Sequence, residues 1–538
     1  MGTLDTKNSE KVRCISREII EYLIMNPLIS KDKITNLKGR IGKKYNYSKV
    51  IKNATILEFA ADKEKEIITQ ILKRRKTRTL SGVSVIAIMT KPLPCPGTCI
   101  YCPGSDSQPG AKVAQSYTGK EPAAMRSIHN NYDPYLQVQS RINDLEAIGH
   151  VVDKIELIIM GGTFLSVDLN YQENFIKGTI EGVIEQRVES LKEAKKLAET
   201  SKRRIVGITI ETRPDYCKEK EVDRMLNFGT TRVELGIQTV YDDIYNLVKR
   251  GHTSVDSIEA IRIAKDAGLK INAHIMPNLP GSTLDKDLEL FDKLFSNPEY
   301  RPDMLKIYPT LVIDGTKLYN WWKAGKYFPY LNKDLIDLIA TVKKNLPSYV
   351  RIQRIMRDIP ANLIEAGCKN SNLRQLVQER LGEMKETCKC IRCREVGLLS
   401  KKEINFEKIK LYRQDYEASQ GKEIFLSFEN KHENYLIGYL RLRKPSEFAH
   451  RPELNDGKTL IVREIKVVGE MVPKDLKPHR LTQIQHRGYG KLLMEKAESI
   501  SRHEFDAKKL AVISGIGVRD WFYDIGYKLD GVYVSKIL

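Results

Sequence analysis

The sequence has no apolar run long enough to cross a membrane. Its longest apolar runs, VSVIAIM and IELIIM, are far shorter than the ~18 residues that a spanning helix needs. Cysteine is also scarce, with nine residues in a chain of 538, which excludes a disulfide-stabilised scaffold. Internal repeats and low-complexity tracts are absent as well. We therefore expect a globular protein of the reducing cytoplasm, without a signal peptide and without a membrane partner.

Acidic residues are outnumbered by basic ones. The chain contains 89 Lys and Arg against 69 Asp and Glu, a formal charge of +20. Residues 1 to 80 alone contain 19 basic and 9 acidic residues, which is half of the excess in under a sixth of the chain. This balance favours a polyanionic partner such as nucleic acid, although any single basic run can equally be a solvated helical face. The length predicts two to four domains.

Between about residues 80 and 360, short apolar runs rich in β-branched residues alternate with longer stretches of helical periodicity. Such runs are typical of strands buried on both faces, and stretches such as SVDSIEAIRIAKDAGL indicate crossover helices between them. We predict a parallel sheet, as an open or closed βα barrel, whose chemistry lies in the loops after the carboxyl ends of the strands. The predicted strands are VSVIAIM (83–89), KIELIIM (154–160), RIVGITIET (204–212), RVELGIQT (232–239), KINAHIM (270–276), MLKIYPTL (304–311) and YVRIQRI (349–355).

The two ends of the chain differ from this central region in their predicted secondary structure. Residues 1 to about 75 are mainly helical by pattern and form a basic amino-terminal unit. After residue 400, the runs KEIFLSFEN, YLIGYLRLR and TLIVREIKVVGEMV predict antiparallel strands, and a glycine-rich turn then opens an amphipathic helix. The runs KLAVISGI and DGVYVSK predict two further strands. We therefore expect a separate α+β domain at the carboxyl end.

Three cysteines directly follow the first predicted strand. Cys95, Cys99 and Cys102 have the spacing CxxxCxxC in the stretch KPLPCPGTCIYCPG. Three thiolates from one loop can hold three irons of a [4Fe-4S] cluster and leave the fourth iron open to another ligand. A structural zinc loop is the alternative, but no fourth ligand lies nearby in the sequence. Chance spacing is the other alternative.

Two further features follow neighbouring predicted strands. The sequence GGTF (161–164) comes directly after the second strand, and Glu211 and Arg213 lie at the end of the third. Because parallel strands end at one edge of a sheet, we expect these residues to converge with the cysteines.

The cysteine spacing after the first strand of a βα barrel, with a glycine pair after the second, resembles the radical SAM superfamily. The resemblance implies that S-adenosylmethionine (SAM) chelates the open iron through its amino and carboxylate groups. Reductive cleavage would then give a 5′-deoxyadenosyl radical that abstracts a hydrogen atom. Gly161, Gly162 and Thr163 match the glycine motif of the superfamily, which offers backbone groups to the SAM amino group.

The stretch QHRGYG has the form Q-x-x-G-x-G at the start of a predicted helix, after the strand REIKVV. Glycines permit a tight turn that exposes backbone N–H groups at a helix amino terminus, where a pyrophosphate is favoured. The order of elements resembles motif A of the GNAT acetyltransferases and implies acetyl-CoA binding, although an ordinary strand-turn-helix corner is the alternative. The implied contacts are Glu464, Ile465, Lys466, Val467, Gln485, His486, Arg487, Gly488, Tyr489, Gly490 and Lys491.

The sequence departs from the GNAT pattern near its end. Trp521 and Phe522 stand where related domains commonly carry a tyrosine pair, so a phenol that could protonate the departing CoA thiolate is missing there, although Tyr523 is adjacent. This departure argues against conventional amine acetylation more than against CoA binding. Phe522 is a candidate for an apolar contact with the cofactor, and packing is the favoured alternative for all three aromatic residues.

Several connecting motifs resemble the catalytic subunits of Elongator complexes, in an archaeal form, over essentially the whole chain. These are AQSYTGKEPAAMR, YDPYLQ, LKIYPTLVIDGTKLY, RIMRDIPANLIEAGCKNSNLR and IRCREVG. The resemblance implies a tRNA acyltransferase that installs a carboxymethyl group on carbon 5 of the wobble uridine. Radical abstraction from the acetyl group, addition to the uracil and thioester hydrolysis would link the two halves. Lys154 matches a lysine that the family is thought to use in holding acetyl-CoA near the cluster; a solvent-facing lysine is the alternative.

The stretch CKCIRCR contains the second cysteine group, Cys388, Cys390 and Cys393. It resembles the structural zinc site of the same family, whose fourth ligand cannot be identified from the sequence. A second iron–sulfur cluster is the competing interpretation. Cys14, Cys217 and Cys368 have no cluster partner, and we assign them no role.

The resemblance implies an α/β plus α+β chain with a radical SAM partial TIM-type barrel, a C-terminal GNAT acetyltransferase domain and a helical basic N-terminal module. The implied domains are 1–75 (basic helical tRNA-binding module), 76–385 (radical SAM), 386–397 (zinc-binding linker) and 398–538 (acetyltransferase). The implied partners are a tRNA anticodon stem loop, SAM, acetyl-CoA and an external electron donor, with a homodimer or Elongator-like subunits as candidates.

Two other functions are compatible with parts of the sequence. One is a protein lysine acetyltransferase in which the cluster is only structural, but the basic balance suits RNA better than lysine-rich tails. The other is an RNA-binding scaffold with degenerate domains, which the intact cysteine and glycine motifs disfavour. His274, at the end of a predicted strand near the expected site, is more often a satisfied core histidine than a catalytic one.

Overall fold

The computed structural model describes residues 3–27, 29–47, 50–72, 81–104, 113–399, 404–469 and 484–538. The chain forms two compact units. The smaller comprises residues 1–84 and 139–153, and the larger comprises residues 85–138 and 154–538. Each unit is described by itself below. Among the described helices, none combines the length and hydrophobicity of a membrane-spanning segment.

The smaller unit is helical over its described amino-terminal residues, as the sequence pattern predicted. Its helices pack around isoleucines and leucines that recur at helical spacing, such as Ile15, Ile19 and Leu23 on the first helix and Ile34 and Ile41 on the second. Residues 73–80, which contain the predicted boundary at residue 75, lie outside the described residues. The helices are α1 (Thr3–Met25), α2 (Lys31–Lys44), α3 (Asn53–Glu58) and α4 (Asp62–Leu72).

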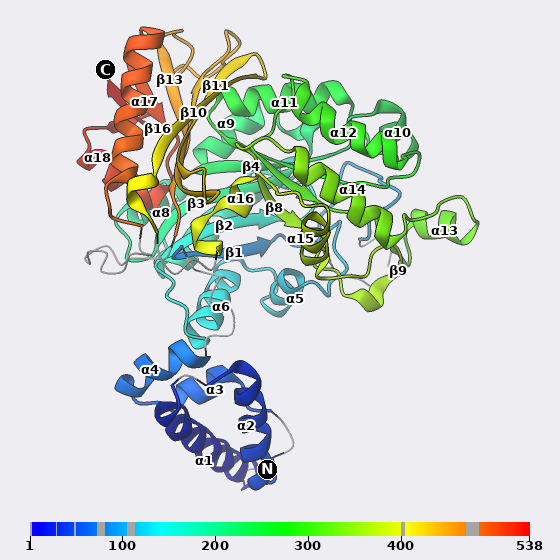
Figure 1. Ribbon diagram of the computed structural model, residues 1–538, viewed down its shortest axis with the longest axis vertical. Coiled ribbons are helices and arrows are strands. Elements are labelled where there is room, and N and C mark those ends of the chain that lie inside the picture. The colour runs from blue at the N-terminus through cyan, green and yellow to red at the C-terminus, as the bar shows by residue number, and fades with distance from the viewer. Residues whose placement is uncertain are drawn as a thin grey trace. The chain divides into compact units, whose positions relative to one another are not determined.

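The larger unit begins with a seven-stranded sheet in the order β1-β2-β3-β4-β5-β6-β8 (Figure 1). The pairs from β2 to β8 are parallel, which confirms the predicted parallel sheet, and β1 and β8 are its edge strands. Strand β4 is buried on both faces over most of its length, as predicted, whereas β2 is buried only at alternate residues. The strands are β1 (Val83–Met89), β2 (Lys154–Met160), β3 (Arg204–Thr212), β4 (Thr230–Gln238), β5 (Lys270–Ile275), β6 (Met304–Ile307) and β8 (Arg351–Ile355).

One predicted strand is shorter than the sequence indicated. The run 304–311 was expected to form one strand, but β6 ends at Ile307. Pro309 follows two residues later and has no backbone N–H to donate to a neighbouring strand. The chain instead forms β7 (Val312–Ile313), which pairs antiparallel with β9 (Ile364–Ala366).

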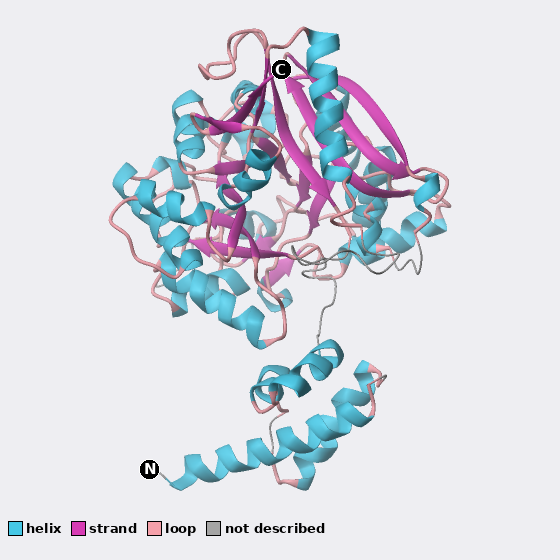
Figure 2. Ribbon diagram, turned by 90° about the vertical axis from the view of Figure 1, so that its left-hand side faces the viewer, coloured by secondary structure: helices cyan, strands magenta, loops and turns pink. Residues whose placement is uncertain are grey.

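Helices connect the parallel strands and lie outside the sheet (Figures 1 and 2). Helix α11 shows why they form where they do: Thr253 caps its amino terminus through a reciprocal box with Asp256, and Gly268, with φ of +87°, lets the chain leave its carboxyl end. The connecting helices are α5 (Pro122–His129), α6 (Pro134–Ala147), α7 (Leu169–Ile184), α8 (Leu191–Glu199), α9 (Glu219–Asn227), α10 (Asp242–Leu247), α11 (Ser254–Asp266), α12 (Leu284–Ser296), α13 (Lys317–Lys323) and α14 (Asn332–Asn345). Helices α15 (Leu373–Glu383) and α16 (Ile391–Arg394) follow β8 and lead to the second sheet.

A second seven-stranded sheet follows, in the order β10-β11-β12-β13-β14-β16-β15. Its first four strands are antiparallel, one more than the sequence predicted, because the alternating run of β10 was missed. The predicted run TLIVREIKVVGEMV forms β13 up to Val467, and its residues from 470 on lie outside the described residues. The elements are β10 (Lys410–Ala418), β11 (Gly421–Asn430), β12 (Tyr435–Lys444), β13 (Thr459–Val467), α17 (Tyr489–Phe505), β14 (Lys509–Val512), α18 (Arg519–Asp524), β15 (Lys528–Asp530) and β16 (Tyr533–Ile537).

The two faces of the second sheet are covered differently. One face packs its leucines and isoleucines against α17 and α18 in an apolar core. The other face carries the buried arginines Arg441, Arg443 and Arg463, which reach residues at the amino ends of the first sheet's strands. Asp303, directly before β6, accepts two hydrogen bonds from Arg463 at 2.9 and 2.5 Å. The two sheets are therefore joined through buried, charged contacts.

Candidate active site

The cysteine loop follows β1, and the carboxyl ends of β1 and β2 meet there. The backbone N–H of Thr90, just after β1, donates to the carbonyl of Met160, the last residue of β2, at 3.0 Å. The thiol of Cys95 lies 3.5 Å from the hydroxyl of Thr163, in the loop after β2. The predicted convergence of the cysteines with the GGTF stretch is therefore present in the structure.

Buried donors surround the thiols. Arg250 donates from Nη1 to the Sγ of Cys99 at 3.4 Å, and Gln115 donates from Nε2 to the Sγ of Cys102 at 3.4 Å. The hydroxyl of Ser116 lies 3.1 Å from the same sulfur. Burial, with the nearby Cys99, raises the pKa of Cys102 to about 11, so a thiolate at this position requires a positive partner such as iron.

A second buried arginine is aimed at the loop. Arg213, at the end of β3, forms two 2.9 Å hydrogen bonds with Asp215, while its Nη1 is buried without a hydrogen-bond partner among the described residues. A methyl group added to Gly97 would lie 2.0 Å from this Nη1, so the guanidinium is pressed against the cysteine loop. An orphaned buried donor is rare in proteins, and an anionic group held by the loop would satisfy it.

The glycine pair after β2 has a backbone that L side chains rarely adopt, and its first member has no room for a side chain. Gly161 has φ of +122° and Gly162 has φ of +72°. A Cβ atom on Gly161 would lie 2.3 Å from the Oγ1 of Thr90. Both the left-handed backbone and the close approach require glycine here, and they keep the backbone beside the cysteine loop open.

The two cysteine groups differ in geometry. The sulfur atoms of Cys388, Cys390 and Cys393 all lie within 4.8 Å of one another, whereas the three cysteines after β1 do not form such a set in the part of the chain that the structure describes. Ligands of a single zinc ion lie close together because each is about 2.3 Å from the metal. The wider spacing after β1 fits thiolates that bind different irons of one cluster.

The second group lies at the start of α16: Cys388 and Cys390 are buried and precede the helix, and Cys393 lies within it. The Sγ atoms of Cys388 and Cys393 donate toward Cys390, and these hydrogen bonds hold its pKa well below the ordinary value. The backbone N–H of Ile391 donates to Val350 at 2.9 Å and fixes the loop beside β8. Within the described residues, no fourth His, Cys, Asp or Glu joins this set, so the fourth ligand is still not identified.

Inside the first sheet, charged side chains meet at the carboxyl ends of β3 to β6. Glu234 on β4 accepts a hydrogen bond from Asn272 at 3.0 Å, lies 3.0 Å from the ring of His274, and pairs with the ammonium of Lys306. Lys306 also donates to Glu211 at 3.3 Å. Burial opposes the charge on Glu234, but Lys306 and His274 outweigh it and hold the pKa of Glu234 well below its usual value.

His274, for which a satisfied core role and a catalytic role were considered, lies in this cluster. Its ring contacts Glu234 and packs edge-on against Tyr308, with centroids 5.4 Å apart. The histidine is therefore part of a polar cluster and not of an apolar core. Glu211, Glu234 and His274 present ligand atoms close enough for a metal ion, but the ammonium of Lys306 already bonds to both carboxylates, so the chain supplies its own cation there.

The charged residues continue from this cluster toward the amino ends of the strands. Arg232, two residues before Glu234 on β4, lies 3.7 Å from Glu234 and pairs with Glu156 on β2. At the other end, the hydroxyl of Tyr117 donates to Glu211 at 3.1 Å. Charged and polar side chains therefore form a row along the inner face of this sheet, in contrast to the apolar layers that fill most βα barrels.

The glycine-rich turn QHRGYG lies at the amino end of α17, as predicted. Gly488 is the residue before the helix and has φ of +86°. Strand β14 pairs with β13 only as far as Val462, opposite Val512. Among the described residues, Glu464 to Val467 therefore extend beyond β14 and pair only with β12. Glu464, in this extension, accepts hydrogen bonds from Tyr439 and Arg441 at 2.9 Å each.

Two predicted site residues are found away from the cysteine loop. Lys154 is the first residue of β2, so six residue steps of ~3.3 Å, about 20 Å of strand, separate it from Met160 at the other end. Phe522 is 3% exposed and packs in the apolar core beneath α17, edge-on to Trp521 and Tyr527. The packing role considered for Phe522 therefore accounts for its position.

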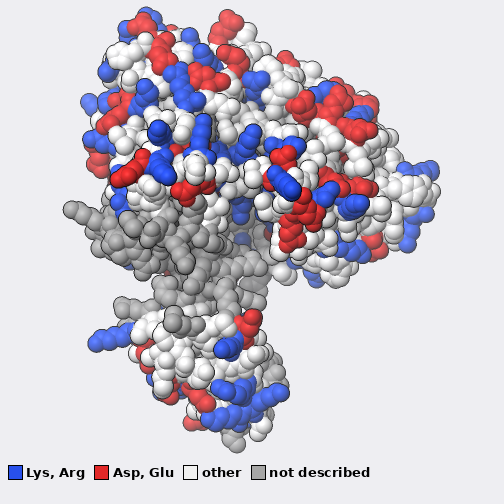
Figure 3. All heavy atoms as spheres, viewed as in Figure 1, with Lys and Arg blue, Asp and Glu red and all other residues white. Residues whose placement is uncertain are grey.

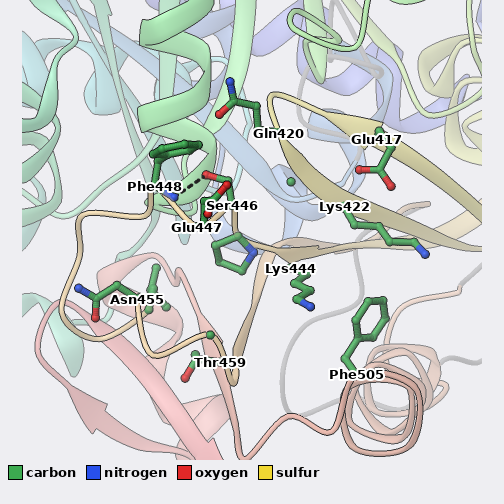
Figure 4. A pocket seen from close by; sticks show the side chains of 14 residues that line it. Glu417, Gln420, Lys422, Lys444, Ser446, Glu447, Phe448, Asn455, Thr459 and Phe505 are labelled. Carbon is green, nitrogen blue, oxygen red and sulfur yellow. Dashed lines mark hydrogen bonds between the residues drawn. The ribbon is translucent and has the colours of Figure 1, made fainter.

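A cavity of about 590 Å³ opens between the β10–β11 turn and the β12–β13 loop. Lys422, Lys444 and Phe505 line it together with polar residues of the loop (Figure 4). Its lining contains none of the residues that the sequence analysis singled out. The cavity is therefore separate from the sites described above.

Several residues of the site were not predicted from the sequence. They are Gln115, Ser116, Tyr117, Arg232, Glu234, Arg250, Lys306 and Arg357, the last of which donates to the carbonyl of Ser116. The available signal was a charged residue inside an apolar strand, as in RVELGIQT and MLKIYPTL, because such a residue must find a buried partner.

Comparisons with known proteins agree with these features. Family models match at residues 94–294 (Radical SAM superfamily), 302–383 (Radical_SAM C-terminal domain) and 12–80 (ELP3 N-terminal domain). The chain is 46% identical to a tRNA uridine(34) acetyltransferase of Methanocaldococcus jannaschii over 99% of both chains. It is 42% identical to Elongator complex protein 3 of Schizosaccharomyces pombe over 97% of both chains. The solved structure of the archaeal Methanocaldococcus infernus Elp3 with an N-terminal deletion has a TM-score of 0.76, with 45% identity, and covers 86% of this chain and 100% of that one.

Proposed function

Because the chain belongs to the family of Elongator complex protein 3 and the tRNA uridine(34) acetyltransferases, we propose that it modifies carbon 5 of the wobble uridine of tRNA. The product is a carboxymethyl group whose two carbons come from acetyl-CoA. The enzyme is a radical SAM-dependent tRNA uridine acyltransferase, and its formal charge of +20 suits a polyanionic RNA substrate.

Cys95, Cys99 and Cys102 hold the [4Fe-4S] cluster, and Gly161 to Thr163 lie beside SAM. When bound, the cluster and SAM supply the 5′-deoxyadenosyl radical that takes a hydrogen atom from the methyl group of acetyl-CoA. The donors of Arg250 and Arg213 face the loop and stabilise the negative charge of the cluster thiolates.

The polar cluster inside the sheet receives the uracil. The ammonium of Lys306, held between Glu211 and Glu234, is a donor for a uracil carbonyl. Tyr117 completes the wall on the side of the cysteine loop, through its hydrogen bond to Glu211. Glu234 stays ionised at neutral pH and so favours the protonated form of Lys306. Lys306 can then act as an acid and donate its proton to a group of the product.

Acetyl-CoA binds the second sheet, which acts as the GNAT domain. The strand residues Glu464 to Val467 extend past β14, so their backbone groups on that side are available to the pantetheine arm. The turn from Gln485 to Lys491 leads into α17, whose amino terminus favours the pyrophosphate. Lys154, at the amino end of β2, is on the side of the sheet that faces this domain. It is a candidate for holding the acyl donor there, about 20 Å of strand from the cysteine loop, and not near the cluster as the resemblance implied.

Zinc is the metal of the second cysteine group. Cys388, Cys390 and Cys393 are close enough to bind one ion, and thiolates are preferred zinc ligands. Such a site would tie the loop before α16 to β8 and so support the connection between the two sheets.

The observation that carries this proposal is the convergence of the cysteine loop, the glycine pair and the Lys306 cluster at one side of one parallel sheet. The test is an anaerobic reaction of the iron-reconstituted protein with tRNA, SAM, acetyl-CoA and dithionite, followed by mass spectrometry of the nucleosides. We expect carboxymethyluridine with the wild-type protein and none with Cys99→Ala.

Cys217→Ala is the matched control, because Cys217 is buried and outside both cysteine groups. It should form carboxymethyluridine at the wild-type rate. Deoxyadenosine without a modified nucleoside would refute the assigned RNA substrate or acyl donor while leaving the radical chemistry in place. Acetylation of a lysine-rich protein in the same assay, independent of Cys99, would instead establish the protein acetyltransferase function.

A further inference from the structure

The segment from α13 to the start of α14 is strongly basic. Residues 315–333 contain four lysines, Lys317, Lys323, Lys326 and Lys333, and no Asp or Glu. All four are exposed, and none forms an ion pair with a residue that the structure describes. Figure 3 shows Lys and Arg side chains gathered at the edge of the larger unit where α13 lies in Figure 1. The positive charge of these lysines is therefore not neutralised within the described residues and can attract an acidic partner.

Large apolar side chains are exposed in the same segment. Phe328 is 73% exposed and Leu331 is 72% exposed. Their backbone is nevertheless fixed, because Tyr327 donates through its hydroxyl to the carbonyl of Asn278 at 2.8 Å and Tyr330 donates to Asp287 at 2.9 Å. Apolar side chains that stay in water on an anchored backbone are typical of an interaction surface. We call Lys317, Lys323, Lys326, Lys333, Phe328 and Leu331 the α13 face.

The α13 face is directly connected to the cysteine loop. The backbone N–H of Leu318 donates to the carbonyl of Ile100, between Cys99 and Cys102, at 2.8 Å. Ile100 and Leu318 share a buried cluster in which Tyr327 also packs, with Trp321 and Trp322 at its edge. The segment that carries the α13 face therefore packs directly against the loop that the proposed function assigns to the cluster.

We propose that the α13 face is the docking site of a small acidic electron-carrier protein that reduces the cluster. This inference rests on the proposed function, because each SAM that is cleaved consumes one electron, and the carrier would leave oxidised by one electron. The face combines the three properties that such a partner requires: positive charge, an exposed apolar centre and a direct packed connection to the cysteine loop.

RNA is the competing partner for a basic surface. The position of the face favours a protein. The segment packs on the cysteine loop through Leu318, whereas the substrate cluster of Lys306 lies on the strands of the sheet.

The test uses the reconstituted holoenzyme and an acidic 2[4Fe-4S] ferredoxin as the probe, titrated anaerobically by calorimetry at low and high salt. We expect the triple variant Lys317→Glu, Lys323→Glu and Lys326→Glu to weaken binding by about tenfold or more. The variant Phe328→Ser with Leu331→Ser should weaken it similarly, and both should fold, because the altered side chains are exposed. The control, Lys408→Glu, Lys410→Glu and Lys458→Glu, carries the same charge change on exposed lysines of the second sheet.

A second readout separates docking from chemistry. Deoxyadenosine formation driven by dithionite, which needs no docking surface, should be unchanged in both face variants, while formation driven by ferredoxin should fall with the affinity.

Equal ferredoxin affinity in the face and control variants overturns the proposal, as does a lack of salt-sensitive binding by the wild-type protein. Loss of anticodon stem-loop binding with ferredoxin binding retained would assign the face to RNA and also overturn it. A wild-type protein that forms no deoxyadenosine with dithionite would refute the proposed function, whereas the titration still decides the docking site.

Discussion

Replacing Asp303 by Asn tests whether buried charges hold the two sheets together. Asp303 is fully buried and carries the salt bridge to Arg463, with further contacts at 3.7 Å from Lys265 and Arg441. Asn keeps the shape, and its Oδ1 can still accept the hydrogen bond that Ile271 donates at 2.8 Å. Its amide nitrogen then stands where Asp303 accepts from Arg463 at 2.5 Å, so the substitution removes the negative charge together with the acceptor of that hydrogen bond.

The expected loss of stability is large because the cations remain buried. Arg441, Arg463 and Lys265 would then share Glu423 and Glu464 as their nearest carboxylates. Removing one partner of a buried ion pair typically costs about 3–5 kcal/mol, since the other charge stays desolvated. We expect Asp303→Asn to lower the free energy of unfolding of the larger unit by about this amount.

Urea unfolding followed by tryptophan fluorescence and circular dichroism measures the effect. Asp314→Asn is the control, because Asp314 is exposed and the change should cost less than ~0.5 kcal/mol. Adding Arg463→Met to Asp303→Asn should recover part of the loss, since the uncompensated cation is removed as well. A midpoint for Asp303→Asn that equals that of the control would refute the reasoning.

Three further predictions follow from the site. Gly161→Ala should abolish SAM binding in equilibrium dialysis, because its Cβ would lie 2.3 Å from the Oγ1 of Thr90 at a positive φ. Cys388→Ser should lose about one zinc per chain in elemental analysis and keep about four irons. Lys306→Met should reduce carboxymethyluridine formation at least ~100-fold and raise the pKa of Glu234, seen as a new group in the pH–rate profile, because the main cation that offsets its burial is gone.

Each of these has a result that would contradict it. SAM affinity unchanged in Gly161→Ala would show that the loop adjusts without cost. Iron lost together with zinc in Cys388→Ser would indicate a second cluster. An unaltered pH–rate profile in Lys306→Met would mean that Arg232 and His274 alone keep the Glu234 carboxylate ionised.

The sequence predicted the first sheet well because its strands are continuous β-branched runs with glycine or charged residues between them. All seven predicted runs contain a strand of that sheet. The errors are local. Pro309 ended β6 early, and β10 was missed because only its alternation, without a strong apolar face, marks KLYRQDYEA as a strand.

The site was predicted less completely. The cysteine and glycine motifs are short in sequence and could be read directly, whereas the Lys306 cluster is assembled from four different strands. Arg250 reaches Cys99 across 151 positions of the sequence, and no local pattern marks such a pair. Motifs show which ligands a loop offers, but the partners that neutralise buried charges come from the order of the strands in the sheet.

The charges on the inner face of the first sheet also determine whether the base or the phosphate of a nucleotide can approach the Lys306 cluster. Glu211 and Glu234 together carry two negative charges, and Lys306 carries one positive charge between them. This negative balance in a desolvated space repels a phosphodiester, whereas uracil is uncharged and presents both a donor and acceptors. Under the proposed function, the wobble nucleotide enters base first, turned out of the anticodon loop, with its phosphates kept outside this cluster.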